Sequence, residues 1–465
     1  MKRAAVLASA AFLTGCTVGP NYKRPDVPTP PQFRGAERAA TPESLADIKW
    51  FDLFQDDVLK QLARTALEQN HDVQIASERV LEARAEVGLA CARMLPNVNA
   101  TAAFNAVRGS LIGQSHFNFP GVIFDSSYTQ AGFSLNWELD VWGRLRRINE
   151  AARAQYLASE EARRAVITTL VADVTTLYFE LRELDLALDI AHKTRDIAGN
   201  SLRITTVRRN RGAATGLDVH QAEQFLYTAT SQIAAIEREI GQTENALSIL
   251  LGNNPGDIPR GKALEDLKPP PQVPPGLPSA LLERRPDIRQ AEQALVAANA
   301  AIGVAKSQYF PAISLTGFLG GQSRALTNLF TGPARQWNFS SPTTLPVFTA
   351  GLIRSNVRMT EAQKRETLAN YEKAIQSAFR EVSDALIGYR KNTEQREQQE
   401  LLVKALQETD RLSRLRYQGG IDSYLQVLDA ERNLFQGELL LAQLRREELL
   451  SVVQLYRALG GGWQQ

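Results

Sequence analysis

Residues 130–141, QAGFSLNWELDV, alternate strictly between two kinds of side chain. The odd-numbered residues, from Ala131 to Val141, are apolar, and the even-numbered residues, from Gln130 to Asp140, are polar or glycine. Successive side chains of a β-strand point to opposite faces of the sheet. The stretch therefore predicts a strand with one apolar face and one water-facing face.

Three further runs resemble this one, and together they predict four strands, at 97–106, 128–142, 312–321 and 336–348. Runs of this length match the strands that cross a bilayer. A four-stranded sheet cannot close, and an open edge is not tolerated in hydrocarbon. A shared barrel follows, in which two chains would supply eight strands and three would supply twelve with a wider lumen. The edge of a soluble sandwich also alternates and is the other interpretation of any single strand.

Long helices account for most of the remaining chain. No glycine or proline occurs from 144 to 198, and 352–418 contains a single glycine, at 388. These stretches predict helices at 144–209 and 352–418, and apolar residues spaced by about 3.5 between 170 and 191 indicate a coiled-coil seam. Shorter helices are expected within 56–95, 217–251, 287–310 and 421–459, where two short helices stacked end to end would match one long helix.

The body of the chain is duplicated. Residues 72–101 align without a gap on 287–316, and residues 143–252 align on 351–460. Glycines at 143, 212 and 252 match glycines at 351, 420 and 460. The predicted fold class is mainly α with a β-barrel part. Its first repeat is 56–252, its second is 287–460, a Pro-rich linker or equatorial segment occupies 253–286, and a tail occupies 461–465.

The N-terminus has the pattern of an export signal. A basic start precedes an apolar run at 4–13, which is too short to span a bilayer as a helix. Residues 13–16, LTGC, resemble the lipobox of bacterial lipoproteins, so we expect removal of 1–15 and acylation of Cys16. A chance cysteine near an ordinary cleavage site is the alternative. Six prolines between 20 and 42 predict an extended tether over 16–55.

Composition argues against several classes of protein. Lys plus Arg is 53 and Asp plus Glu is 51, so the net charge of +2 gives no basis for binding nucleic acid. Two cysteines and four scattered histidines predict no metal site and no cofactor beyond the lipid on Cys16. No P-loop, HExxH, GxSxG or dinucleotide glycine pattern occurs, so we do not expect an enzyme.

Four segments carry a resemblance to a known family: CTVGPNY at 16–22, LPSALLERRPDI at 277–288, residues 420–432, and LGGGW at 459–463. They resemble the outer-membrane efflux lipoproteins of the OprM/NodT type in the TolC superfamily, and the similarity covers nearly the whole mature chain. The resemblance implies a homotrimer with a twelve-stranded barrel in the outer membrane, continued by a long α-helical coiled-coil barrel in the periplasm.

The same resemblance implies the function. The chain would be the passive exit duct of a tripartite efflux pump, anchored by lipid in the outer membrane. Its partners would be a periplasmic adaptor (membrane fusion) protein and an inner-membrane transporter of the resistance-nodulation-division class. A lipid-anchored periplasmic coiled-coil scaffold without channel activity is the alternative, which explains the helices but not the amphipathic strands. A general diffusion porin would explain the strands but not the helices.

Each long helix ends at a glycine-containing turn, and in the family these turns meet the adaptor. Carried over to this sequence, the docking candidates are Arg209, Gly212, Thr215, Asp218, Gly420 and Ser423. Tyr417 occupies the position in the second turn that Arg209 occupies in the first. Ordinary turn and capping residues are the alternative explanation.

The helix after the second turn carries the gate candidates. Leu425 and Asp429 are four residues apart and therefore share one helix face. In related ducts the matching residues form constricting rings, and the matching arginine, here Arg432, helps to hold the closed state. A ring of leucines would narrow and dewet the path, and a ring of carboxylates would favour cations. The alternative is a solvated helix face with an Asp429–Arg432 pair.

Overall fold

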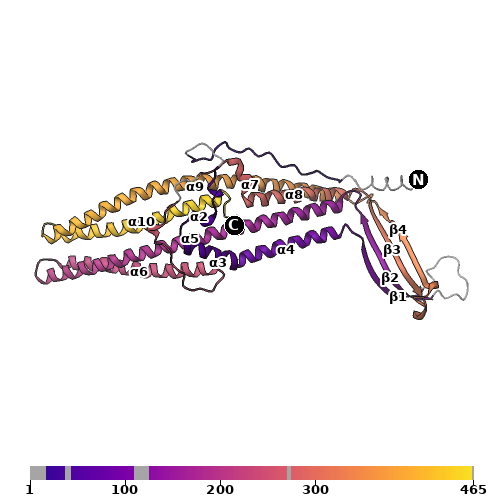
Figure 1. Ribbon diagram of the computed structural model, residues 1–465, viewed down its shortest axis with the longest axis horizontal. Helices are drawn as coiled ribbons and strands as arrows, with labels where there is room; N and C mark the ends of the chain where they lie inside the picture. Colours follow the sequence, from indigo (N-terminus) through magenta and orange to yellow (C-terminus); the bar gives the residue numbers. More distant parts are fainter. Residues whose placement is uncertain (1–16, 37–42, 109–124, 270–273, 463–465) are drawn as a thin grey trace. The chain divides into compact units, whose positions relative to one another are not determined.

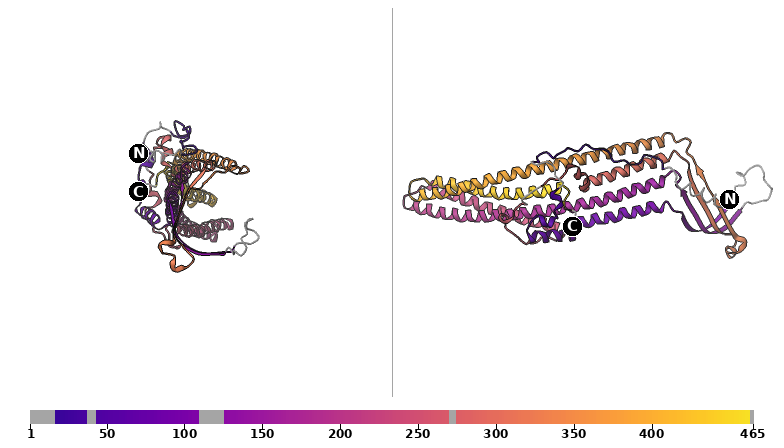
Figure 2. Two further views of the ribbon diagram at one scale, coloured as in Figure 1. Left: turned by 90° about the vertical axis from the view of Figure 1, so that its right-hand side faces the viewer. Right: turned by 45° about the horizontal axis from the view of Figure 1, so that its top comes forward.

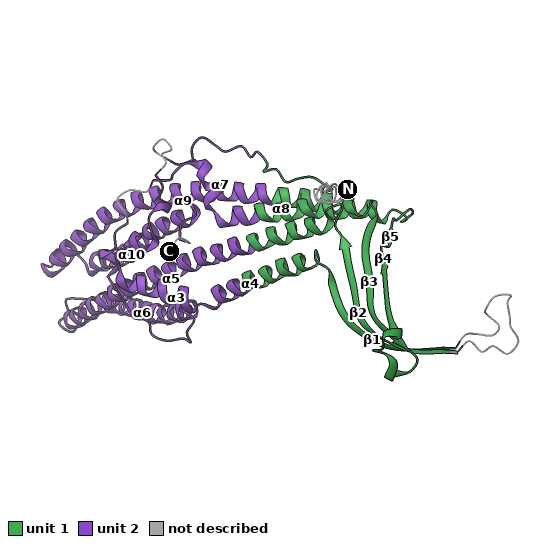
Figure 3. Cartoon of the chain, turned by 45° about the vertical axis from the view of Figure 1, so that its right-hand side comes forward, with its two compact units in different colours: residues 1–25, 80–158, 292–370 green, residues 26–79, 159–291, 371–465 purple. Residues whose placement is uncertain are grey.

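The computed structural model describes residues 17–36, 43–108, 125–269 and 274–462 (Figure 1). The chain falls into two compact units, drawn in two colours in Figure 3. Unit 1 comprises residues 1–25, 80–158 and 292–370, and unit 2 comprises residues 26–79, 159–291 and 371–465. The expected signal peptide at 1–15 and the expected acylation site Cys16 lie outside the described residues.

The duplication is visible as pairs of elements of equal length. The pairs are α4 (His71–Ala92) and α8 (Pro286–Ser307) with 22 residues, β1 (Asn97–Arg108) and β3 (Ala312–Ser323) with 12, α5 (Arg144–Asn210) and α9 (Leu352–Gln418) with 67, and α6 (Gly216–Leu250) and α10 (Tyr424–Ala458) with 35. Within unit 2, α6 lies beside α5 and α10 lies beside α9 (Figures 1 and 2). Each copy therefore contains one long helix with a short helix folded back against it.

The strands form one antiparallel sheet in unit 1, in the order β1-β2-β3-β4. β2 is Asp125–Leu139, and β4 (Arg335–Ser340) and β5 (Thr343–Thr344) both pair with β3. The short helices η4 (Leu326–Asn328) and η5 (Gly332–Ala334) lie in the β3–β4 connection. The register places Phe133 opposite Leu319, and Leu319 opposite Trp337. These side chains form an exposed apolar row, as the alternating pattern predicts, with exposed fractions of 60%, 65% and 76%.

All four strand predictions differ from the structure at their ends. β1 and β3 each run two residues beyond the predicted bounds, and β2 begins three residues earlier, at Asp125. The strand expected at 128–142 stops at Leu139, because the Asp140 carboxylate accepts hydrogen bonds from the backbone N–H groups of Leu145 and Arg146, at 2.9 Å each, and caps α5. The strand expected at 336–348 divides into β4 and β5. Proline at 342 and 346 has no N–H to donate to a ladder, so pairing cannot continue.

The expected tether at 16–55 is not extended throughout. The short helices η1 (Leu45–Asp47) and α2 (Trp50–Leu53) form near its end. Trp50 is buried against Tyr456, with ring centroids 5.3 Å apart. The spacing of the prolines does not predict these helices, because they are short and depend on packing against α10.

The helix expected within 56–95 is interrupted at Asn70, between α3 (Asp57–Gln69) and α4. The Asn70 side-chain oxygen accepts from the backbone N–H of Asp72 at 2.8 Å and caps α4. Its amide nitrogen donates to the carbonyl of Leu250, the last residue of α6, at 3.0 Å. The second copy repeats this contact, since Arg285 donates to the carbonyl of Ala458, the last residue of α10, at 3.0 Å.

A glycine follows each of these helix ends in a left-handed conformation. Gly252 has φ of +76° and Gly460 has φ of +81°. A Cβ on Gly252 would lie 2.4 Å from the carbonyl oxygen of Gln69, and a Cβ on Gly460 would lie 3.1 Å from that of Arg284. The glycines therefore both terminate the helices and allow the neighbouring backbone to approach.

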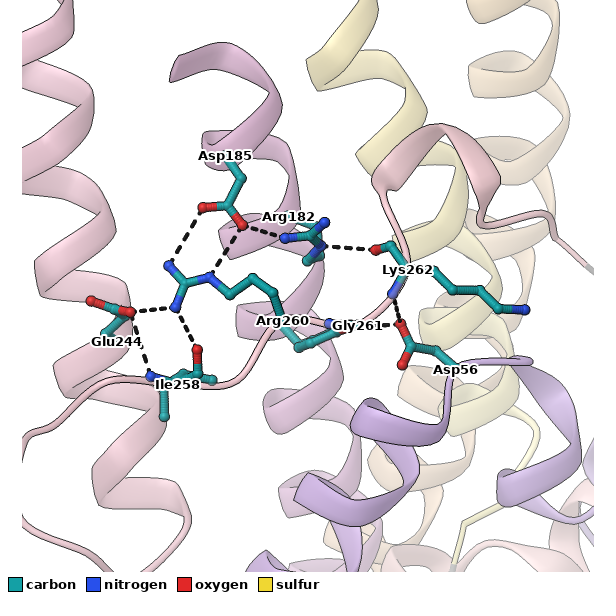
Figure 4. Close-up of polar contacts among 9 residues, drawn as sticks. Asp56, Arg182, Asp185, Glu244, Ile258, Arg260, Gly261 and Lys262 are labelled. Atoms are coloured by element: carbon teal, nitrogen blue, oxygen red, sulfur yellow. Dashed lines mark hydrogen bonds and ion pairs between the residues drawn. The ribbon is translucent and has the colours of Figure 1, made fainter. Parts of the chain in front are cut away.

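The segment between the copies is anchored to α5 by a polar network, shown in Figure 4. Buried Asp56 accepts from the Tyr178 hydroxyl at 2.7 Å and from the Lys262 backbone N–H at 3.0 Å. Arg260 pairs with Asp185 at 3.2 Å and with Glu244. The segment then forms η2 (Leu264–Asp266), η3 (Pro278–Ala280) and α7 (Leu281–Arg284). The described part of the linker before residue 270 is thus held against α5 and α6 by polar contacts.

The apolar core of the helical hairpins lies in unit 2. It joins α5, α6 and α10 through buried residues that include Leu184, Phe225 and Phe435. Of the predicted coiled-coil positions on α5, Leu170, Val174, Leu181, Leu184 and Ala191 are buried. Among the described residues, no helix combines the length and the apolar composition needed to cross a membrane.

We predict that Gly252→Ala destabilises the protein by about 1–3 kcal/mol, because alanine is strained at positive φ and its Cβ would meet the Gln69 carbonyl. Thermal unfolding followed by circular dichroism measures the effect. Gly241→Ala is the matched control, because Gly241 lies inside α6 with open space around it. This variant should be more stable than the wild type by up to about 1 kcal/mol. Equal behaviour of the two variants would contradict the role of Gly252.

Candidate gate and docking turns

The first turn, between α5 and α6, carries four of the predicted docking residues. Arg209, Gly212 and Thr215 are exposed, and Asp218 is half-buried. Gly212 has φ of +77°, and a Cβ there would meet nothing within 4 Å. Thr215 and Asp218 form a capping box, in which the Thr215 N–H donates to Asp218 at 2.7 Å and the Asp218 N–H donates to the Thr215 hydroxyl at 3.2 Å. Thr215 and Asp218 therefore have a capping role within the chain, as the alternative explanation allows.

The second turn, between α9 and α10, carries Gly420 and Ser423 but no capping box. Gly420 has φ of +71°, and Ser423 occupies the cap position without a side-chain hydrogen bond. Gln426 stands at the position that corresponds to Asp218, so the reciprocal carboxylate contact is missing. An ion pair between Arg416 and Asp422, at 3.1 Å for one of its contacts, closes this turn instead.

Arg208 connects the two turns, and the sequence pattern did not identify it. Its guanidinium lies over the Tyr417 ring, 4.3 Å from the ring centroid, and donates to the Tyr417 carbonyl at 3.2 Å. A cation over an aromatic ring is stabilised by the ring quadrupole. Arg208 corresponds to Arg416 in the alignment of the copies, which marks it as a turn residue but does not reveal its partner across the two hairpins.

The gate candidates lie on the exposed face of α10. Leu425 is 52% exposed and Asp429 is exposed, whereas Val427 and Leu428 are buried on the other side of the helix. Asp429 accepts a hydrogen bond from Asn433 at 3.3 Å. Within the part of the chain that the structure describes, no ion pair joins Asp429 to Arg432. Asp429 is exposed and Arg432 is half-buried, and the ring arrangement stays a prediction.

Buried Glu431 lies next to the gate candidates Asp429 and Arg432 in the sequence, and the sequence analysis did not identify it. Its side chain is 1% exposed, pairs with Arg414 at 3.2 Å and accepts from the Ser201 hydroxyl at 3.0 Å, so it joins α10 to α9 and α5. Arg414 also pairs with Asp410 at 2.9 Å. Burial raises the pKa of Glu431 to about 7, although Arg414 and the Ser201 hydrogen bond lower it. The sequence offered no sign of this burial.

Comparison with known proteins identifies the family. The model of the family described as outer membrane efflux protein matches residues 62–253 and 277–461. This chain belongs to the outer membrane efflux protein family. It is 37% identical over 461 residues to the cation efflux system protein CusC of Escherichia coli O6:H1, covering 98% of each chain. It is 38% identical over 467 residues to the toluene efflux pump outer membrane protein TtgC of Pseudomonas putida, covering 99% of this chain and 95% of that protein.

Solved outer-membrane channels have the same fold. The open-state MtrE outer membrane channel of Neisseria gonorrhoeae superposes with a TM-score of 0.86 at 32% identity, covering 96% of this chain and 99% of that one. The CmeC outer membrane channel of Campylobacter jejuni gives a TM-score of 0.90 at 25% identity, with coverage of 96% and 95%. These comparisons confirm the predicted TolC-like fold, mainly α with a β part and internally duplicated, and the outer-membrane location of this family member.

We predict that the packing of α10 against α5 and α9 around Glu431 becomes less stable as pH rises. Because the folded-state pKa of Glu431 is raised above its ordinary value of 4.5 to about 7, the folded state retains a proton that the unfolded state has lost. The stabilisation is complete below pH 4.5 and is lost as pH rises through 7. Hydrogen exchange of α10 between about pH 5 and pH 8 measures it.

Glu431→Gln should remove most of this pH dependence. The matched control is Glu223→Gln, at the equivalent position of the first copy, where the carboxylate is less buried and pairs with His220. A pH profile that Glu431→Gln leaves unchanged would contradict the assignment to Glu431.

Proposed function

We propose that this chain is the exit duct of a tripartite efflux pump in the outer membrane. It works as a homotrimer and a passive channel, without a catalytic residue, metal or cofactor. Cargo reaches it from an inner-membrane transporter of the resistance-nodulation-division class through a periplasmic adaptor protein. The observation that carries the proposal is a sheet with an apolar face, whose edge strands β1 and β4 each have one unpaired side among the described residues, in a member of the outer membrane efflux protein family.

The edges support assembly with other copies. In the described sheet, β1 pairs with β2 alone, and β4 pairs with β3 alone. Trp337 and Phe339 on β4, and Val98 on β1, are more than half exposed on the same apolar face. An unpaired edge in hydrocarbon leaves backbone groups without hydrogen bonds, and pairing β1 of one copy with β4 of the next removes this cost. Three copies then give twelve strands and a lumen lined by the polar face.

The turns and the helix α10 in unit 2 would carry the docking and gating functions. Arg209, Gly212 and Gly420 are exposed at the turns and are available to the adaptor, together with Thr215, Asp218 and Ser423. Leu425 and Asp429 face away from the hairpin core and would form rings around a threefold axis, where Arg432 of each copy ties the closed state. A ring of carboxylates favours cations, and a ring of leucines dewets the path.

The names of the relatives indicate that the duct does not set the cargo. CusC is named for cation efflux and TtgC for toluene efflux, and this chain is nearly equally identical to both, at 37% and 38%. A lumen lined by polar side chains selects weakly, so the partner transporter would determine the substrate. The scaffold alternative leaves the exposed row of Phe133, Leu319 and Trp337 without a role.

A lipid on Cys16 would add an anchor beside the sheet. The residues directly after Cys16 are held in unit 1, where buried Arg147 donates to the Asn21 side chain at 2.8 Å and to the carbonyls of Val18 and Gly19 at 3.3 Å each. Asn299 donates to the Pro20 carbonyl at 2.8 Å. The acylated terminus therefore starts from a fixed position. Several acyl chains, at about 0.8 kcal/mol for each buried CH₂, hold a protein on a bilayer permanently.

We predict that Asp429→Ala combined with Arg432→Ala raises single-channel conductance in planar bilayers severalfold, because the charges that constrict and tie the tip are removed. Glu408→Ala combined with Arg411→Ala is the matched control, since it removes an exposed i,i+3 ion pair from α9 and should leave conductance unchanged. Unchanged conductance in the Asp429 and Arg432 variant would overturn the gate assignment.

We also predict that Cys16→Ser abolishes acyl labelling of the protein in growing cells, because the thiol is the attachment point. Labelling with a radioactive or alkyne-tagged fatty acid measures this. Cys91→Ser, which alters the other cysteine of the chain, should leave labelling intact. Persistent labelling of the Cys16 variant would remove the lipid anchor from the proposal.

A further inference from the structure

A groove of about 700 Å³ lies on the apolar face of the sheet in unit 1. It is lined by the small side chains of Ala100, Ala102 and Ala131 and by the large side chains of Leu319 and Trp337. It is lined mainly by apolar atoms and is open along one side, so it has the shape and chemistry to hold a hydrocarbon chain.

The β3–β4 connection completes the groove. Gly321 on β3 lies so close to this connection that a Cβ would meet the Leu329 carbonyl oxygen at 2.2 Å. Leu329 is consequently 3% exposed, packed over the sheet, and its neighbour Phe330 lines the groove while remaining 86% exposed. A side chain at residue 321 would separate the connection from the sheet, so the glycine makes the groove possible.

The groove lies toward the end of the sheet that is farther from the helices. β1 follows α4 and β3 follows α8, so these strands start at the helical end and run toward the β3–β4 connection. Leu319 is closer to Ser323, the last residue of β3, than to Ala312, the first. With the helices in the periplasm, which is part of the proposed function, the groove opens to the outer leaflet.

The β3–β4 hairpin, which forms one side of the groove, carries charges of one sign. Residues 312–348 contain Arg324 and Arg335 and no aspartate or glutamate. Arg335 lines the groove, and neither arginine has an ion-pair partner among the described residues. An exposed guanidinium above a hydrocarbon-filled groove complements a phosphate, which it can bind by two parallel hydrogen bonds.

We propose that this groove binds the phosphorylated glycolipid of the outer leaflet, with an acyl chain over Ala131 and a phosphate at Arg335. The inference rests on the proposed function, because it needs the apolar face in the membrane. One groove in each copy gives three sites in the trimer. The lipid fills the space between the sheet and the β3–β4 connection and so supports the outer end of the duct.

Native mass spectrometry of the full-length trimer, supplied in mild detergent with diphosphoryl lipid A, dimyristoyl phosphatidylglycerol or dimyristoyl phosphatidylcholine, tests the proposal. We expect the wild type to retain up to three lipid A molecules under activation that removes both phospholipids. Ala131→Leu should abolish this retention by filling the groove. Arg335→Gln should reduce it to the level of phosphatidylcholine.

Two controls match these variants. Ala103→Leu makes the same change on the opposite face of the sheet, and Arg354→Gln removes an exposed charge from α9. Both should retain lipid A as the wild type does. Circular dichroism and the trimer mass show whether each variant is folded. If Ala131→Leu does not fold, the retention of lipid A by Arg335→Gln alone tests the proposal.

Three outcomes would overturn the inference. They are equal retention of lipid A and phosphatidylcholine by the wild type, retention of phosphatidylglycerol as strong as that of lipid A, and retention by Arg335→Gln equal to the wild type. Conductance of the same preparation in planar bilayers distinguishes failure of the lipid-binding inference from failure of the proposed duct function. A conducting trimer without bound lipid refutes the groove alone, whereas a chain that neither trimerises nor conducts refutes the duct.

Discussion

The helical part of the chain depends on how the ends of its short helices are satisfied. The last carbonyls of a helix have no partner within it, and an end buried in the protein must find one elsewhere. Here the end of α6 accepts from Asn70, directly before α4, and the end of α10 accepts from Arg285, directly before α8. Because α5 and α9 are continuous, these contacts join two short helices in each copy without a covalent helical link. The same contact thus stabilises the corresponding helices in both copies of the duplicated sequence.

Features determined locally could be predicted from the sequence. The helix predicted at 352–418 has those bounds because a run without proline and with one glycine has no strong stop signal before Gly419. The first strand of each copy is recognisable for the same reason, since alternation is a property of neighbouring residues. The β4–β5 division and the cap at Asp140 also have local causes, Pro342 and the N–H groups of residues 145 and 146, but alternation of apolar and polar residues does not register them. The helices at 45–53 depend on contacts with distant residues such as Tyr456, and the local pattern could not reveal them.

The same distinction applies to the candidate site. The exposed face that carries Leu425 and Asp429 follows from a spacing of four residues along one helix. The Arg208 contact with Tyr417 joins residues 209 positions apart, and the Ser201 contact with Glu431 joins residues 230 positions apart. Both were missed because neither partner is visible from the local sequence around the other. Periodicity can identify a face, but tertiary packing determines which charges on it are buried, paired or free.

The two copies differ at the turns that end α5 and α9, and this difference has a consequence for any partner that binds there. Thr215 and Asp218 close the first turn as a capping box, whereas Arg416 and Asp422 close the second as an ion pair. Glu223 is half-buried and pairs with His220, whereas its equivalent Glu431 is buried and pairs with Arg414. In the proposed homotrimer, three turns of each kind would face the adaptor. An adaptor that recognises only one kind of turn would find three equivalent binding sites, related by the threefold axis. If six adaptor copies bound, three would contact turns of the first kind and three would contact turns of the second kind.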